Sequence, residues 1–293
     1  MKPLLDSTLL ARLKPYRLAV RTARASSGIG ERTSRRKGLG MEFEDHREYQ
    51  PGDDIRHLDV HVWSRLGVHA VRQFARQQQL AVTVLVDCSA SMAAGSPAKL
   101  ELAVKLAAMI AQLSVSGSDR VRVGAISAGK LRWYAPCDNQ RQLAQLFRWL
   151  AGLRPTGNTD LRAAALRSRP LLTGEGMLVV ISDWLCAERQ QALKIWQASG
   201  QEIIGLQVLA AEELDPALNG SGPVNLTDSE SGTALQVDLG PATFSEYRQV
   251  LDSFLESLRA GLVAGAGRRF LYPSGADLER EVLAGWRESG FVR

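Results

Sequence analysis

Five oxygen-bearing side chains stand at positions where an α/β protein would gather them in one place. Asp87, Ser89 and Ser91 follow a short β-branched run, Asp183 follows a second run, and Thr159 lies between them in a polar stretch. Two carboxylates and three hydroxyls form an all-oxygen set, which suits a hard cation such as magnesium (Mg2+) or manganese (Mn2+) in a shell that keeps water. The sequence therefore predicts a divalent-metal site at these residues.

The spacing also indicates what such an ion would do. In the pattern Asp-x-Ser-x-Ser, alternate side chains of one tight loop can point at one ion. With neutral hydroxyls as direct ligands, the ion would stay strongly electrophilic and would seek a carboxylate from outside. We therefore expect a site that binds a partner protein and is not an enzyme's catalytic centre.

The elements around these residues alternate between strand and helix from Leu80 onward. β-Branched runs predict strands at 82–86, 121–126, 131–135, 177–181, 203–209 and 269–272. Helical patterns predict helices at about 98–115, 140–152, 160–171, 187–199, 243–264 and 276–288. This alternation is typical of a mostly parallel sheet covered by helices on both faces, whose ligands bind at the carboxyl ends of the strands. The runs at 121–126 and 131–135 are too close for a parallel crossover, so they predict an antiparallel pair at the sheet edge.

Other stretches predict less regular structure. Residues 212–233 are rich in Asp, Asn, Gly, Ser and Pro and predict a surface loop. Residues 43–65 are polar and turn-rich, with a turn signal at Pro51–Asp54, and residues 68–74 alternate loosely enough for a strand. Before them, the segment from about Leu9 to Arg24 predicts a short basic helix.

The amino-acid composition limits the classes of protein to which this chain can belong. The chain has 293 residues, is 45% hydrophobic and carries a net charge of +5. Residues 1–80 hold 15 Lys and Arg against 9 Asp and Glu, so the positive charge belongs to the N-terminal quarter. Three widely spaced cysteines suit a reducing compartment, and no apolar run is long enough to span a membrane. We expect a cytoplasmic protein.

Two upstream segments carry a more specific pattern. Gly38–Phe43 (GLGMEF) and Arg47–Asp59 (REYQPGDDIRHLD) resemble the bacterial family known as domain of unknown function 58, in which this region leads into a von Willebrand factor A domain. Asp87–Ser91, Thr159 and Asp183, in this order, resemble the metal-ion-dependent adhesion site (MIDAS) of that domain. One departure is Val60, which follows Asp59 where the family usually has Trp.

The resemblance implies an α/β fold with a doubly wound, mostly parallel sheet (von Willebrand A-type, Rossmann-like), one antiparallel edge strand and a small N-terminal module. Its domains would be a basic N-terminal arm at 1–37, a family-specific module at 38–79, and the A-type domain at 80–293, including the C-terminal strand and helices. In this resemblance Ser89, Ser91 and Thr159 ligate the ion directly, whereas the two aspartates act directly or through water.

The same resemblance implies a partner. It is a MoxR-type AAA+ ATPase, or a client protein of that ATPase, which would reach the ion through a carboxylate. The chain would then be an adaptor or co-chaperone in the assembly or remodelling of a complex.

Several alternatives remain open. A magnesium-dependent hydrolase of the phosphatase kind would use Asp87 as nucleophile, although Ser89 stands where such enzymes usually have their second carboxylate. The basic segment 11–37 could bind nucleic acid, but no aromatic stacking platform accompanies it. Asp87–Ser91 could be an ordinary polar turn, and Thr159, Asp160 and Asp183 could act only as helix caps. The pair His57 and His61 lacks a third metal ligand, and Cys88 and Cys186 are interpreted as small buried residues.

Overall fold

The computed structural model describes residues 3–20, 42–50, 58–75, 79–230 and 232–293. By their contacts the residues divide into two compact units, one formed by Met1–Arg24 with Leu80–Arg293 and the other by Ala25–Gln79. All five predicted metal ligands belong to the larger unit. In the part of the chain that the structure describes, no helix is both long enough and apolar enough to cross a membrane.

A six-stranded sheet forms the centre of the larger unit. Its strands are β3 (Ala81–Asp87), β4 (Arg120–Ser127), β5 (Lys130–Trp133), β6 (Gly176–Ser182), β7 (Glu202–Leu209) and β10 (Arg268–Pro273), in the order β10-β7-β6-β3-β4-β5. Every neighbouring pair is parallel except β4 and β5, which are antiparallel. The prediction of a mostly parallel sheet with an antiparallel edge pair is therefore confirmed.

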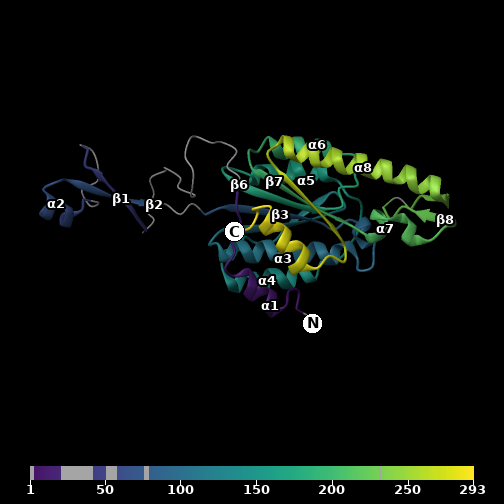
Figure 1. Cartoon of the computed structure of the whole chain (residues 1–293), viewed down its shortest axis with the longest axis horizontal. Helices are drawn as coiled ribbons and strands as arrows, with labels where there is room; N and C mark the ends of the chain where they lie inside the picture. The colour runs from purple at the N-terminus through teal and green to yellow at the C-terminus, as the bar shows by residue number, and fades with distance from the viewer. Residues whose placement is uncertain (1–2, 21–41, 51–57, 76–78, 231) are drawn as a thin grey trace. The chain divides into compact units, whose positions relative to one another are not determined.

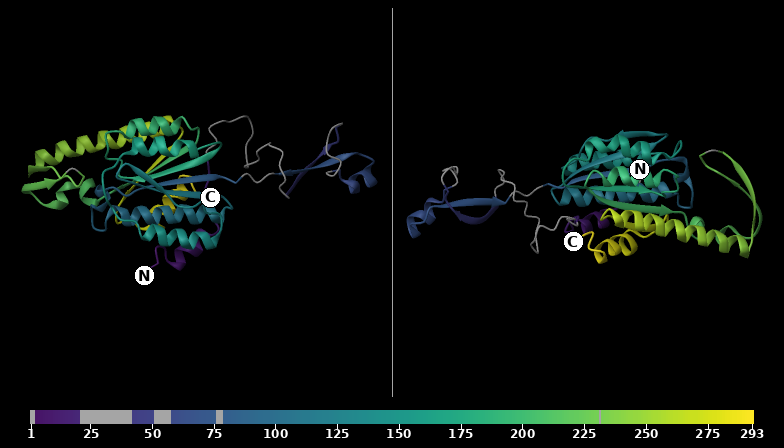
Figure 2. Two further views of the ribbon diagram at one scale, coloured as in Figure 1. Left: turned by 180° about the vertical axis from the view of Figure 1, so that it is seen from behind. Right: turned by 90° about the horizontal axis from the view of Figure 1, so that it is seen from above.

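Helices cover both faces of this sheet. On one face lie α3 (Lys99–Ser116) and α4 (Gln140–Ala151), and on the other lie α5 (Leu161–Ser168), α6 (Arg189–Gln197) and α8 (Pro241–Ala264) (Figure 1). The view from behind shows the same two layers (Figure 2). Each layer has its own cluster of buried side chains, as expected when strands are buried on both faces.

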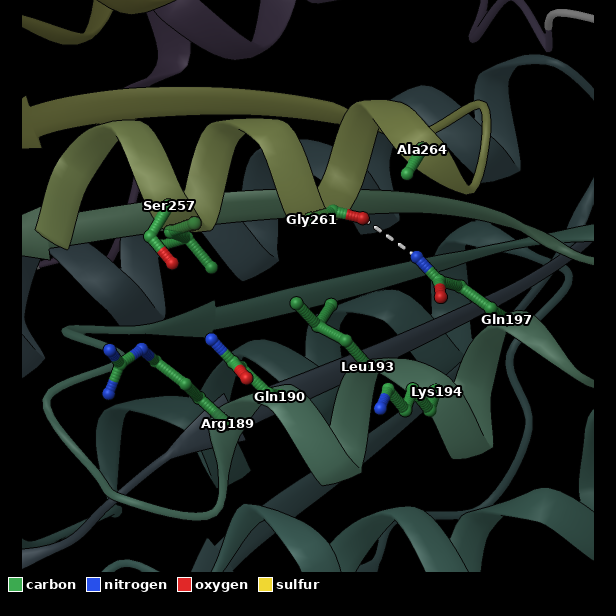
Figure 3. Close-up of a pocket in the computed structure, with 9 residues that line it drawn as sticks. Arg189, Gln190, Leu193, Lys194, Gln197, Ser257, Gly261 and Ala264 are labelled. Atoms are coloured by element: carbon green, nitrogen blue, oxygen red, sulfur yellow. Dashed lines mark hydrogen bonds between the residues drawn. The ribbon is translucent and has the colours of Figure 1, made fainter. Parts of the chain in front are cut away.

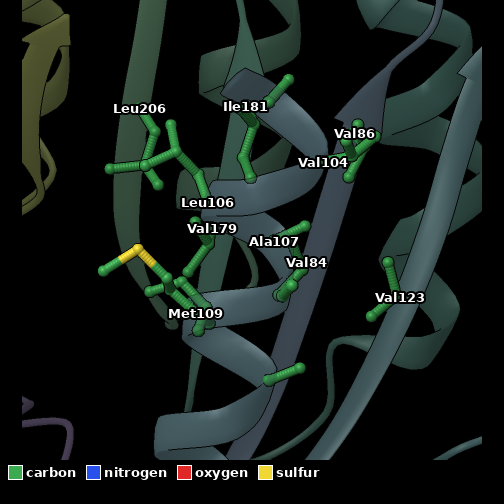
Figure 4. Close-up of a cluster of buried hydrophobic side chains, with 14 of the residues drawn as sticks. Val84, Val86, Val104, Leu106, Ala107, Met109, Val123, Val179, Ile181 and Leu206 are labelled. Atoms are coloured by element: carbon green, nitrogen blue, oxygen red, sulfur yellow. The ribbon is translucent and has the colours of Figure 1, made fainter. Parts of the chain in front are cut away.

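Helix α3 is buried nearly all round, as its sequence predicts. Leu106 and Met109 point from α3 into the layer formed by Val84 of β3 and Val179 of β6 (Figure 4). Fully burying such a side chain contributes about 1.5–3 kcal/mol, so this packing fixes α3 firmly against the sheet. Lys99, the first residue of α3, lies near the carboxyl ends of the strands, where it contacts Asp183.

The N-terminal segment is part of the larger unit and does not form a separate arm over its described residues. Helix α1 (Ser7–Leu13) is shorter than the predicted helix at about 9–24 and ends just before Pro15, which is unfavourable inside a helix. Leu9 and Leu13 are buried against the core that contains α3. Leu18 then pairs antiparallel with Val292. The segment differs from the predicted arm because its leucines are buried, and the pattern of charges does not reveal this burial.

The prediction of a surface loop at 212–233 is wrong. The structure has a short helix α7 (Ala211–Leu214), a 3-10 turn at Pro216–Asn219, and a hairpin of β8 (Gly222–Thr227) and β9 (Ala234–Leu239). Among the described residues these two strands pair with each other and are largely exposed. Val224 and Leu226 alternate with polar residues, as do Leu235, Val237 and Leu239, but the Asp, Asn, Gly, Ser and Pro around them favoured a loop over this short strand pattern.

The C-terminal region carries two further helical elements. The predicted helix at 276–288 is a π-helix at Leu278–Leu283 that continues into α9 (Ala284–Glu288). Asp277 begins it by accepting hydrogen bonds from the backbone of Glu279 and Arg280. Elsewhere, 3-10 turns lie at Ala90–Ala93 and Arg169–Leu171, the second of which ends the segment predicted as a helix at 160–171.

Over its described residues, the smaller unit contains an antiparallel pair and a helix. Strand β1 (Glu42–Glu48) pairs with β2 (Ala70–Ala75), and α2 (Val60–Leu66) lies between them in sequence, capped by Asp59. The region predicted as turn-rich thus contributes a strand and a helix. The predicted turn at Pro51–Asp54 and the residue His57 lie outside the described residues.

Candidate metal centre

Both predicted carboxylates lie at the carboxyl end of the sheet. Asp87 is the last residue of β3, and Asp183 directly follows β6, which pairs with β3 in parallel. Parallel neighbours end at the same edge, so the chain direction alone brings the two aspartates together. Both side chains are buried, at 0% and 1% exposure.

Asp87 is held by two hydrogen bonds. Its Oδ1 accepts one from the backbone N–H of Ser89 at 2.9 Å, and its Oδ2 accepts one from Ser182 Oγ at 2.6 Å. Burial, followed by the negative charge of Asp183, raises the pKa of Asp87 to about 6, against the lowering effect of these hydrogen bonds. The carboxylate of Asp87 is therefore oriented by these hydrogen bonds, whereas its negative charge is poorly neutralised by its surroundings.

The two serines and Asp183 form a continuous group of oxygens. Ser89 Oγ lies 3.0 Å from Ser91 Oγ, which donates to Asp183 Oδ2 at 2.9 Å. Asp183 Oδ1 accepts a hydrogen bond from the backbone of Leu185, so this aspartate stabilises a turn and does not cap α6. With the contact between Ser89 and Asp87, the structure thus links four of the five predicted ligands by hydrogen bonds.

The loop that carries Thr159 lies against the loop after β3. The backbone of Ala90 donates to Gly157 O at 2.8 Å, and the backbone of Thr156 donates to Cys88 O at 2.8 Å. Gly157 has a φ of +71°, and a Cβ there would lie 2.5 Å from Ala128 Cβ. Only glycine fits this approach, which packs the loop of Thr159 against the turn between β4 and β5.

Thr159 itself bonds to a carboxylate that the sequence did not indicate. Its Oγ1 donates to Glu230 Oε1 at 2.8 Å, and its backbone N–H donates to Glu230 Oε2 at 3.1 Å. Among the described residues no hydrogen bond joins Thr159 directly to the other four predicted ligands. Asp160, one residue on, caps α5 by accepting from the backbone of Ala163.

A buried ammonium group completes the site. Lys99 Nζ lies 2.8 Å from Asp183 Oδ2 and 2.6 Å from Glu213 Oε1, and its side chain has 0% exposure. Burial alone lowers the pKa of Lys99, but the charges and hydrogen bonds of Asp183 and Glu213 outweigh it, and the pKa is raised. Lys99 therefore remains charged.

This arrangement fits a hard divalent cation. Its donors are hydroxyl and carboxylate oxygens, and the named ionisable groups are four carboxylates (Asp87, Asp183, Glu213 and Glu230) against one ammonium (Lys99), which leaves a formal excess of negative charge. Over the described residues no group of three His, Cys, Asp or Glu side chains could hold a metal, so a site here depends on the hydroxyls. That donor set favours Mg2+ or Mn2+ over zinc.

Sequence reasoning missed four residues of the site, namely Lys99, Ser182, Glu213 and Glu230. Ser182 had a usable signal, because it is the last residue of a buried strand and directly precedes Asp183. Lys99 stands at the start of a helix that is otherwise apolar, which is a weaker signal. The two glutamates follow β7 in a region without a strong pattern, so their approach depends on the tertiary fold.

Two remaining features contribute no ligand to the site. Cys88 is a free, buried thiol whose pKa burial and the Asp87 charge raise to about 12, so it is unreactive at neutral pH. A pocket of about 220 Å³ between α6 and α8 is lined by residues such as Arg189, Leu193 and Gly261 (Figure 3). None of the five predicted ligands lines this pocket.

Comparison with known proteins identifies relatives over most of the chain. The model of the family described as protein of unknown function DUF58 matches residues 45–252. Uncharacterized proteins of Mycobacterium bovis and Mycobacterium tuberculosis are 31% identical over 249 residues, which is 83% of this chain and 77% of each relative.

Solved structures give more distant similarities. The conserved hypothetical protein BatB from Bacteroides thetaiotaomicron is 16% identical, with a TM-score of 0.46, over 72% of this chain and 98% of that chain. An aerotolerance-related membrane protein from Bacteroides fragilis is 19% identical, with a TM-score of 0.46, over 72% of this chain and 97% of that chain.

Proposed function

We propose that this chain, which belongs to the family of proteins of unknown function DUF58, is a metal-dependent protein-interaction module. The observation that carries the proposal is a chain of oxygens in which Ser91 Oγ lies 3.0 Å from Ser89 Oγ and 2.9 Å from Asp183 Oδ2, together with the buried carboxylate of Asp87, which Ser89 contacts. Oxygens of this kind, held by rigid strand ends, are suitable ligands for Mg2+ or Mn2+. The proposed fold of the larger unit is of the von Willebrand A type.

In this proposal the hydroxyls of Ser89, Ser91 and Thr159 hold the ion, and Asp87 and Asp183 support them directly or through water. When bound, the ion supplies an electrophilic centre that accepts a carboxylate from a partner protein. The chain itself orients the ligands: Ser182 and the backbone of Ser89 fix Asp87, and Lys99 fixes Asp183. The 156–159 loop reaches the same edge through its backbone bonds to Cys88 and Ala90.

The proposed partner is a MoxR-type AAA+ ATPase or one of its clients, and the proposed role is that of an adaptor or co-chaperone in the cytoplasm. A binding role is supported over hydrolysis by the state of Asp87. Both of its oxygens accept hydrogen bonds, and the residue two positions on is Ser89, which cannot act as a carboxylic proton donor.

The proposal is tested by affinity capture with the full chain. The tagged protein is incubated with native lysate in Mg2+, in chelator, and as the variant Ser91→Ala, and the captured proteins are identified by mass spectrometry. Ser257→Ala is the matched control, because Ser257 is exposed on α8. An ATPase or client captured only with Mg2+ and intact Ser91 supports the proposal. The same proteins in all samples would contradict it.

A further inference from the structure

The hairpin formed by β8 and β9 reaches the proposed metal centre through one side chain. Glu230 lies in the turn between the two strands, and its carboxylate accepts from both Thr159 Oγ1, at 2.8 Å, and the Thr159 backbone, at 3.1 Å. The two residues are 71 positions apart in sequence. Hydrogen bonds to a carboxylate are stronger than those between neutral groups, so this contact holds the turn firmly.

The base of the hairpin is anchored separately. Before it, Glu213 of α7 pairs with the buried Lys99, and after it, Tyr247 of α8 donates to Glu213 O at 2.7 Å. Arg248 of α8 also pairs with Asp215 at 3.1 Å. Both ends of the hairpin are therefore fixed to the larger unit, independently of the contact made by Glu230.

The parts of the two strands near the turn contribute little to fixing the position of the hairpin. Leu226 and Leu235, one from each strand, are 49% and 63% exposed. A two-stranded hairpin without a packed face is only marginally stable. Because the base is anchored separately, it is the position of the turn against Thr159 that depends on Glu230.

The proposed function requires a carboxylate from a partner protein, and Glu230 supplies a carboxylate from the same chain. A metal ion held by hydroxyls seeks a carboxylate, and here a carboxylate of the same chain already engages one of those hydroxyls. We propose that Glu230 is an internal competitor of the partner's carboxylate, and that the β8–β9 hairpin is a latch that closes the metal centre until the partner displaces it. This inference rests on the proposed function and specifies how the same site is regulated.

The latch implies a population of closed molecules that cannot bind. The apparent affinity for an external carboxylate is lowered by the fraction of molecules that are closed. Removing the charge of Glu230 opens the latch without touching Asp87, Ser89, Ser91 or Asp183. Asp238→Asn is the matched control, because Asp238 is an exposed carboxylate on β9 of the same hairpin.

Two measurements on the full chain test the inference. Hydrogen–deuterium exchange is measured without metal on the peptides that contain Thr159 and residues 222–239. Binding to immobilised poly-L-glutamate is then measured in Mn2+ and in chelator. Glu230→Gln should speed exchange in both peptides and strengthen Mn2+-dependent binding by about tenfold relative to Asp238→Asn, since it removes hydrogen bonds to a charged group.

The outcomes separate the latch from the metal function. Equal exchange in Glu230→Gln and Asp238→Asn would overturn the latch. Faster exchange in Glu230→Gln without stronger binding than in Asp238→Asn, while binding still needs Mn2+, would overturn the competitor role. Faster exchange, with no variant binding in a Mn2+-dependent way, would support the latch and contradict the proposed metal-dependent function instead.

Discussion

Lys99 and Asp183 form an ion pair in which both side chains are almost inaccessible to solvent. Nζ lies 2.8 Å from Oδ2, and the side chains are 0% and 2% exposed. The pair joins the first residue of α3 to the residue that follows β6, which is also one of the proposed metal ligands. Asp183 therefore carries a permanent positive neighbour, which fixes its orientation whether or not a metal ion is bound.

Replacing Lys99 with Met should destabilise the protein by about 3–5 kcal/mol, because it leaves buried carboxylates without their counter-charge. The free energy of unfolding is measured by urea denaturation. Lys105→Met is the matched control, since it makes the same change on the same helix, where Lys105 is only half-buried. Equal stability of the two variants would show that the ion pair contributes little.

Replacing Gly157 with Ala should disturb the loop that carries Thr159. Adopting a left-handed backbone costs a residue with a side chain about 1–2 kcal/mol, and here the clash with Ala128 adds to it. Gly174→Ala isolates the first effect, because Gly174 has a φ of +75° and open space around it. We expect a larger loss of stability in Gly157→Ala, together with weaker Mn2+ binding in calorimetry. Identical behaviour of the two variants would contradict the close packing of the loops.

Addition of Mn2+ or Mg2+ should raise the melting temperature of the protein. An ion at 100 times its dissociation constant stabilises the folded state by about 2.7 kcal/mol. The double variant Ser89→Ala, Ser91→Ala should lose this increase, and chelator should reverse it in the unmodified chain. Ser257→Ala should behave as the unmodified chain does. A similar increase in the double variant would mean that the ion binds elsewhere.

Replacing Leu13 with Ala should destabilise the larger unit by about 2–5 kcal/mol, as is typical for a truncated core leucine. Leu13 is fully buried although it precedes the sheet by a long stretch of sequence. Leu166→Ala, at a position that is 49% exposed on α5, should change stability much less. Both are measured by thermal and urea unfolding. A neutral Leu13→Ala would support the interpretation of residues 1–37 as a separate arm.

The sheet and most of its helices could be predicted from the sequence because their signals are local. Strands buried on both faces have continuous β-branched runs, such as Val82–Val86, and these match the observed strand within a residue or two. Parallel pairing then places strand ends together, so the proximity of Asp87 and Asp183 follows without further information. The antiparallel edge pair was predicted because the connection between the runs 121–126 and 131–135 is too short for a parallel crossover.

The rest of the site could not be predicted because it depends on contacts distant in sequence. Nothing near Glu230 indicates that its carboxylate meets Thr159, since the contact requires the hairpin to fold back over the sheet edge. The hairpin itself is largely exposed, and the short apolar alternation of Leu235, Val237 and Leu239 stands among turn-forming residues that favoured a loop. Likewise, α1 was missed as a core element because the basic residues of the segment 11–37 dominated the interpretation of the N-terminal region, whereas Leu9 and Leu13 determine the packing of α1.

The pairing of Leu18 with Val292 also has a consequence for the order of folding. Arg17 and Arg293 exchange backbone hydrogen bonds of 2.7 and 2.9 Å, and Phe291 and Val292 are buried. The ribosome makes the first of these partners long before the second. Until Val292 has been synthesised, the segment around Leu18 has no partner to pair with, and the larger unit folds fully only after translation has passed Val292.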